Sequence, residues 1–216
     1  YQVLRSSGEQ TSADTNLTSA FSVGTGVRVV NADKLFSQGS IVSTDNALDL
    51  AVDGAGFFQV LLPDGRIGYT RNGTFSRNNE GALTTSSGFV IQPEVVIPED
   101  AQEINVSSDG VVSVQLPGAV EQEEVGQIEL AEFQNRNGLQ PIGESFYVET
   151  TASGEAIIAN PLEGSFGKLV QGALESSNVS VVKELVDMIE TQRAYEVNSK
   201  AISSVDEMLR FISNNL

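Results

Sequence analysis

Large apolar residues recur every seven positions through the last part of the chain. They are Val181, Met188, Tyr195, Ile202, Leu209 and Leu216, with no proline or glycine between them. A strand cannot use this period, whereas a helix that supercoils against a partner can, because 3.5 residues per turn keep one side facing that partner. The repeat therefore predicts a C-terminal α-helix of coiled-coil type, about 35 residues and roughly 50 Å long.

The side of the helix that carries this repeat, which we call the seam, is expected to be an assembly interface. Polar residues occur on or beside it at mid-helix, and such residues fix register and partner number in coiled coils. The alternative is a helix that packs back on its own domain. The predicted seam comprises Val181, Leu185, Met188, Gln192, Tyr195, Asn198, Ser199, Ile202, Val205, Leu209 and Ile212.

Between residues 27 and 172 the pattern changes to short alternating runs that are separated by turn signals. Pro63-Asp64-Gly65 is one such signal, because Asp-Gly tolerates the positive φ of tight hairpin turns. The spacing predicts an antiparallel β domain of short strands and hairpins. The expected strands are 27–30, 48–52, 57–62, 66–70, 74–77, 83–84, 89–92, 104–107, 111–115, 125–133 and 146–150, with Pro93, Pro98, Pro117, Pro141 and Pro161 between them.

The two flanking segments are polar. Residues 1–26 predict an extended polar arm, either a disordered tail or a segment that becomes ordered in an assembly. Residues 173–216 are expected to be a connector followed by the helix. Ser180 is the expected N-cap and Asn178 the competing one.

Composition narrows the possible functions. The net charge is −17, with 29 acidic and 12 basic residues, which argues against nucleic-acid binding because that affinity comes from Lys and Arg. The absence of cysteine and histidine excludes disulfides, His-based triads and zinc sites of the usual kind. No apolar run approaches the roughly 20 residues of a membrane span, and no signal-peptide pattern is present. Because residue 1 is Tyr, we expect the true N-terminus to be missing.

Candidate chemistry is sparse. Gly54-Ala55-Gly56 lacks the third glycine and the helix of a dinucleotide fingerprint, so a tight β connection is favoured. Glu144 and Glu149 lie near aromatic residues and could form a glycosidase-like acid pair, although a solvated strand edge is favoured.

Calcium binding is the remaining option. Asp49, Asp53 or Asp64 could offer oxygens to this ion, but none lies in an alternating acidic loop. Turn roles are favoured, and we predict no catalytic, cofactor-binding or metal-binding residue.

Several motifs resemble those of the bacterial flagellar rod and hook proteins. Residues 192–195 (QRAY) with 198–200 (NSK) are similar to that family's C-terminal signature, and residues 46–58, 69–75 and Ser37-Gln38-Gly39 to its other motifs. The distal rod branch is the most similar, because the opening arm resembles its long N-terminal stretch, and the proximal rod and hook branches are the alternatives. The family's N-terminal helix is not found in this sequence. The motif residues are Gly54, Gly56, Phe57, Phe58, Tyr69, Thr70, Arg71, Gly73, Phe75, Arg193 and Lys200.

The resemblance implies a structural subunit without catalysis or cofactors. In such proteins the N- and C-terminal helices pair around a hollow channel, and subunits stack helically into a rod that crosses the periplasm and transmits torque. It implies as partners copies of the chain, adjacent rod and hook proteins and the surrounding ring bushing, with no nucleic acid and no membrane insertion. It also implies a place in the flagellar basal body and type III export without a cleaved signal peptide. The rival hypotheses are a wall-degrading glycosidase and a carbohydrate-binding β module.

Overall fold

The computed structural model describes residues 33–118 and 121–214 and, nearer the N-terminus, the backbone of four short strands; side chains are described for residues 33–118, 121–208, 210 and 211. The chain forms two compact units, Tyr1–Leu35 and Phe36–Leu216.

The first unit contains two antiparallel strand pairs. β1 (Gln2–Arg5) pairs with β4 (Phe21–Val23), and β2 (Gln10–Ser12) pairs with β3 (Thr15–Asn16). The arm predicted over residues 1–26 is described only at these strands, and the strand predicted at 27–30 lies outside the described residues. The arm and its boundary therefore stay predictions.

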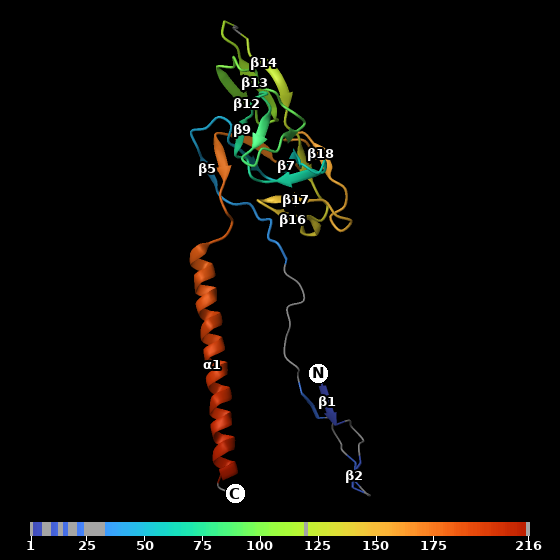
Figure 1. Cartoon of the computed structure of the whole chain (residues 1–216), viewed down its shortest axis with the longest axis vertical. Coiled ribbons are helices and arrows are strands. Elements are labelled where there is room, and N and C mark those ends of the chain that lie inside the picture. Colours follow the sequence, from blue (N-terminus) through green and yellow to red (C-terminus); the bar gives the residue numbers. More distant parts are fainter. Residues whose placement is uncertain are drawn as a thin grey trace. The chain divides into compact units, whose positions relative to one another are not determined.

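The second unit is built on a seven-stranded antiparallel sheet (Figure 1). β7 is central to it because it pairs with β8, β15 and β11. The sheet order is β16 (Gln140–Gly143), β17 (Phe146–Val148), β8 (Ile67–Thr70), β7 (Phe57–Leu61), β15 (Leu130–Glu132) and β18 (Ile157–Ala159), with β11 (Ile91–Gln92) beside β7.

Smaller antiparallel sheets complete this unit. β12 (Glu103–Val106), β13 (Val111–Gln115) and β14 (Glu123–Gln127) form a three-stranded sheet. The two-stranded ribbons are β9 (Phe75–Arg77) with β10 (Leu83–Thr85), β6 (Leu50–Asp53) with β19 (Lys168–Gln171), and β5 (Ile41–Ser43) with β20 (Ala173–Glu175); η1 (Arg136–Gly138) is a short 3-10 helix. The mainly antiparallel β fold is confirmed.

Two assignments from the sequence are wrong. Pro141 does not lie between strands but within β16, where it pairs with Tyr147 of β17. β16 is an edge strand of the sheet, and a proline is tolerated there because an edge leaves some N–H groups unpaired. In addition, the strand predicted at 125–133 is interrupted, so that its residues belong to β14 and β15.

The connector predicted from residue 173 begins later than the sequence indicates. Ala173–Glu175 form β20, which pairs with β5 from the other end of the β domain. The three residues are too few to show a strand period, and their partner is distant in the sequence.

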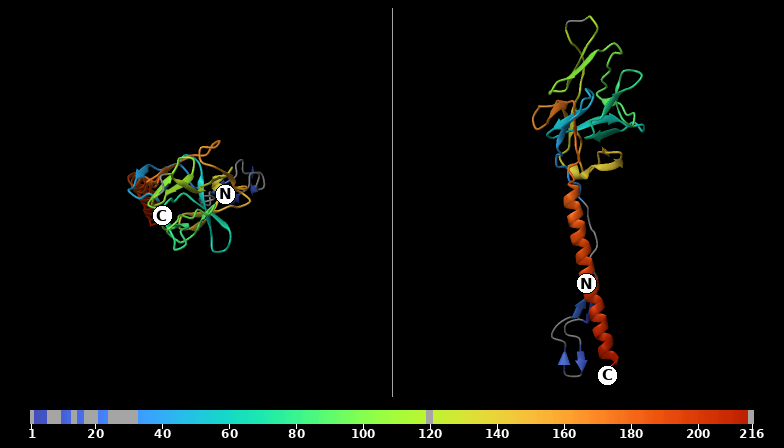
Figure 2. Two further views of the ribbon diagram at one scale, coloured as in Figure 1. Left: turned by 90° about the horizontal axis from the view of Figure 1, so that it is seen from above. Right: turned by 90° about the vertical axis from the view of Figure 1, so that its left-hand side faces the viewer.

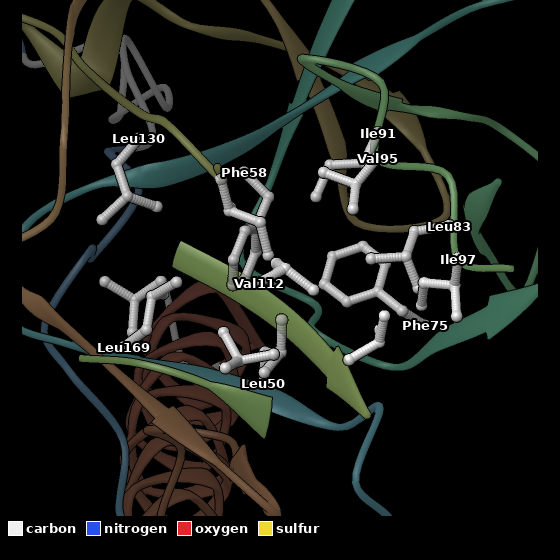
Figure 3. Packing of buried hydrophobic residues seen from close by; sticks show 14 residues of the cluster. Leu50, Phe58, Phe75, Leu83, Ile91, Val95, Ile97, Val112, Leu130 and Leu169 are labelled. Carbon is white, nitrogen blue, oxygen red and sulfur yellow. The ribbon is translucent and has the colours of Figure 1, made fainter. Parts of the chain in front are cut away.

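The core has two clusters, one on each side of β7. Phe58 belongs to the larger cluster, where its ring meets that of Phe75 edge to face at 5.1 Å between centroids (Figure 3). Phe57 belongs to the smaller cluster, with Tyr69 and Phe133. Successive side chains of a strand point to opposite faces, so burial of both phenylalanines explains why β7 is apolar along most of its length.

The helix α1 (Val181–Asn214) is the only α-helix among the described residues. It begins directly after Ser180, whose carbonyl oxygen accepts a hydrogen bond from the Glu184 amide at 3.0 Å. The described side chains of α1 are all exposed, and none belongs to either core cluster. The C-terminal helix is thus confirmed, whereas its coiled-coil character stays a prediction. Over the described residues, α1 lacks the combination of length and hydrophobicity that a bilayer crossing needs.

Candidate assembly interface and neck

The predicted seam lies along α1. Val181, Leu185, Met188, Gln192, Tyr195, Asn198, Ser199, Ile202 and Val205 are exposed; the side chains of Leu209 and Ile212 lie outside the described residues. Tyr195, for example, keeps 75% of its surface accessible. The seam therefore offers apolar surface for contact, and its role as an interface stays a prediction. Arg193 and Lys200 of the C-terminal motif are also exposed on α1.

Arg71 brings several motif residues of the β domain together at the turn between β6 and β7. Its Nη1 donates hydrogen bonds to the carbonyl oxygens of Gly54, at 2.9 Å, and Gly56, at 2.6 Å. Its guanidinium carbon lies 5.9 Å from the centre of the Phe57 ring, within the range of a cation–π contact. Arg71 therefore holds this turn closed.

Gly54 is required by the shape of the turn. Its φ is +121°, and a Cβ atom on it would lie 2.7 Å from the Cα of Gly167. A side chain would meet both torsional strain and a backbone clash. Since β7 follows at Phe57, the interpretation of Gly54-Ala55-Gly56 as a tight β connection is confirmed.

Glu175 of β20 is the acidic partner of Arg71. The Nε of Arg71 and the Oε2 of Glu175 are 3.0 Å apart, and the two side chains are 24% and 13% exposed. The other carboxylate oxygen, Oε1, accepts a hydrogen bond from the Gly39 amide at 2.9 Å. Sequence reasoning missed Glu175 because it assigned this residue to the connector.

Residues 36–43 and 173–178 form what we call the neck. β5 and β20 pair within it (Figures 1 and 2). Beyond these strands the Ser176 amide donates to the Ser40 carbonyl at 2.8 Å, and the Asn178 side chain donates to the Ser37 carbonyl at 2.9 Å. The segment that enters the β domain is thus bonded to the segment that leads into α1.

The Ser37-Gln38-Gly39 motif fits tightly into the neck. A Cβ atom on Gly39 would lie 1.8 Å from the Ser176 carbonyl oxygen, so only glycine allows this approach. The Gln38 side chain donates to the Val52 carbonyl and accepts a hydrogen bond from the Gly54 amide, both at 3.1 Å. Gln38 therefore joins the neck to the β6–β7 turn that Arg71 holds.

The other motif residues of the β domain support its core. Tyr69 packs edge to face on Phe133 at 4.7 Å, and its burial, reinforced by the nearby Glu149 carboxylate, raises its pKa to about 12. Thr70 is buried and accepts a hydrogen bond from the Asn72 amide. The Gly73 carbonyl accepts one from the Leu50 amide at 3.0 Å.

Of the two acids considered for glycoside hydrolysis, Glu144 lines a cavity that Glu149 does not line. Glu144 lies beside a cavity of about 330 Å³ and accepts a hydrogen bond from Ser87 at 2.6 Å. Glu149 is not among the residues that line this cavity. Instead it faces the Tyr69 hydroxyl at 3.5 Å.

The candidate calcium ligands have protein partners. Asp49 accepts hydrogen bonds from Thr44 and Asn46, Asp53 lies 3.3 Å from the Lys168 ammonium, and Asp64 pairs with Arg66. In the described part of the chain, no three acidic side chains gather as metal ligands would.

Comparison with known proteins gives two family matches. Residues 51–114 match the "Flagellar hook protein FlgE/F/G D1 domain" and residues 170–216 the "Flagellar basal body rod FlgEFG protein C-terminal". These segments contain all eleven motif residues and the whole of α1.

Individual relatives agree with these matches. The chain is 47% identical to the flagellar basal-body rod protein FlgG of Buchnera aphidicola from Schizaphis graminum and 44% identical to that of Caulobacter vibrioides, each over 99% of this chain and 82% of the relative. The hook protein FlgE of Salmonella typhimurium is 42% identical over 54% of this chain and 29% of its own length. The resemblance seen in the motifs is confirmed: the chain belongs to the FlgE/F/G family of bacterial flagellar proteins, as a structural subunit of the basal-body rod.

Proposed function

We propose that this chain is a distal rod subunit that assembles with copies of itself, through α1, into a hollow helical shaft carrying torque from motor to hook. The relatives named as rod proteins support this role over the hook role, since they match nearly the whole chain, whereas the hook protein matches about half of it. The observation that carries the proposal is the exposed apolar surface of α1.

The energetics favour burial of this surface in an assembly. Complete burial of one Val, Leu, Ile or Met side chain contributes about 1.5–3 kcal/mol, and α1 exposes Leu185, Met188, Ile202 and other large apolar residues. The two core clusters are formed without α1. A head-to-tail contact that does not close into a ring generates a filament, which is the form that a shaft needs.

Membership of the family supports further expectations about the helix pairing, the partners and the export of this subunit. The seam pairs with an N-terminal helix of the complete protein and with helices of neighbouring copies. Adjacent rod and hook proteins continue the shaft in the basal body, and a ring bushing surrounds it in the periplasm. Export proceeds without a cleaved signal peptide, and the subunit performs no catalysis.

Replacement of Ile202 by Asp tests the assembly role in the complete protein. The variant is expected to form no rods by electron microscopy and to abolish motility, because a buried charge in the seam is unfavourable. Its β domain is expected to unfold at the same denaturant concentration as the parent.

Ser203→Asp is the matched control, because Ser203 is exposed on α1 next to Ile202 but off the seam. It introduces the same residue into the same turn and is expected to assemble. Rods from the Ile202 variant would exclude the seam as the assembly surface. Peptidoglycan cleavage by the parent protein would instead support the glycosidase hypothesis.

A further inference from the structure

Two short apolar strips accompany the seam on α1, and neither belongs to it. The first flank is Val182, Val186 and Ile189, and the second flank is Val197, Ala201 and Met208. All six side chains are exposed. The first flank lies in the N-terminal part of α1 and the second flank in the C-terminal part.

The side of the helix that carries the first flank becomes polar farther along. Positions separated by a multiple of seven share a side of a supercoiled helix. Fourteen residues after the first flank come Glu196, Lys200 and Ser203. A partner that covers the first flank therefore does not find an apolar surface along the rest of α1.

The side that carries the second flank is polar nearer the start of the helix. Fourteen residues before Val197 and Ala201 come Lys183 and Asp187, and seven before Val197 comes Glu190. At 3.5 residues per turn the mean directions of the two flanks are about 120° apart around the axis. The two flanks are thus different surfaces of α1, at different heights along the helix.

We infer that both flanks contact the same kind of partner, a second copy of this chain: the first flank of one copy packs on the second flank of the next. An offset of 19 positions brings Val182 beside Ala201 and Ile189 beside Met208, which corresponds to a stagger of about 28 Å at 1.5 Å per residue. This inference rests on the proposed function and adds the register between neighbouring copies. The contact joins two different surfaces, so it repeats without closing.

The charge distribution favours a second copy. The chain carries a net charge of −17, which opposes association of identical molecules. Within Val181–Asn214, however, only six acidic residues face four basic ones. The helix therefore carries little of the net charge that opposes contact between copies.

The small size of each flank fits a polymer better than an isolated dimer. A stable protein pair buries about 800 Å² on each partner, whereas each flank offers three side chains. One such contact is weak, but each subunit of an array makes two of them in addition to the seam contacts.

Disulfide cross-linking tests this register, because the chain contains no cysteine. We would introduce Ile189→Cys and Met208→Cys together into the complete protein, assemble rods and oxidise them. The expected result is a ladder of linked oligomers on a non-reducing gel, with each single-cysteine variant remaining monomeric. Strong dimers from the single variants would overturn the inference, because like positions would then meet.

A second pair, Val182→Cys with Ala201→Cys, tests the same offset. Asp187→Cys with Ser203→Cys is the control from the polar sides and is expected to assemble without linking. Intact rods without a ladder from both flank pairs would overturn the inference and leave the proposed function standing. Failure of both flank pairs to assemble while the control pair does would support it, since these positions would then be packed. Absence of rods from the unmodified protein would overturn both proposals.

Discussion

Arg71 and Glu175, 104 positions apart in the sequence, meet through the Nε and Oε2 atoms at 3.0 Å. Arg71 also binds the carbonyl oxygens of the β6–β7 turn, and Glu175 also binds the Gly39 amide of the neck. The pair therefore links the core of the β domain to the two segments that enter and leave it.

Loss of this pair is expected to destabilise the β domain. Arg71→Ala should lower the free energy of unfolding by about 2–3 kcal/mol, because it leaves a largely buried carboxylate and two carbonyls without their donor. Denaturant unfolding of the variant measures this change. Arg66→Ala removes an exposed ion pair and should leave stability unchanged; equal effects of the two substitutions would contradict the role of Arg71.

Gly39→Ala is expected to open the neck. The added methyl group would overlap the Ser176 carbonyl, and relief of such overpacking costs about 1–3 kcal/mol. Hydrogen exchange at the Ser176 amide, which bonds to the Ser40 carbonyl, should become faster, while amides of β7 keep their protection. Ser40→Ala changes the neighbouring side chain and serves as the control. Unchanged exchange at the Ser176 amide in Gly39→Ala would refute the close approach of Gly39 to the Ser176 carbonyl.

The raised pKa of Tyr69 predicts a loss of stability at alkaline pH. Its pKa in the folded protein is raised to about 12, whereas an unfolded tyrosine titrates near 10. Below about pH 10 the folded and unfolded states both keep the proton, so the stability is not reduced. As the pH rises toward about 12, the unfolded state ionises first. The free energy of unfolding therefore falls by up to about 2–3 kcal/mol. Unfolding at about pH 9 and pH 11.5 measures this fall.

Tyr69→Phe provides the comparison for this pH dependence. Phenylalanine carries no proton to lose, so the variant should show a smaller alkaline loss than the parent. Other groups that titrate in this range affect both proteins alike. Parallel pH profiles would show that Tyr69 makes no contribution.

Phe58 is expected to be among the most sensitive core positions. Its side chain is fully buried, and Phe58→Ala should destabilise the domain by about 3–5 kcal/mol through lost burial and a residual cavity. Ile157→Ala, on the exposed edge strand β18, should change stability by less than about 0.5 kcal/mol. Denaturant unfolding of both variants is the measurement. A similar loss in the two would argue against the central place of Phe58.

The features that were predicted correctly from sequence are those with local causes. The Asp64-Gly65 turn is confirmed, since it joins β7 and β8 and Gly65 has a φ of +83°. The start of α1 after Ser180 is likewise confirmed. Both depend on residues that are close in the sequence.

The features that were missed have distant causes. β20 is three residues long, and its pairing of Leu174 with Val42 joins opposite ends of the β domain. The motifs identified Arg71 and Gly54 as important but did not identify Glu175. The contact between Glu175 and Arg71 depends on the folded topology. The sequence pattern of α1 did indicate that the helix exposes apolar residues. The seven-residue repeat predicts a helix of roughly 50 Å, which is longer than a domain of this size can cover.

The pairing of β5 with β20 has a consequence for how such proteins vary. Ser43 and Ala173 pair with each other in this ribbon, so the part of the chain between them leaves and returns at one place. Insertions and deletions can accumulate in the loops of this part, away from the residues that bond to the neck, while the ribbon and α1 keep their geometry. The same helical stem can therefore carry outer parts of different sizes.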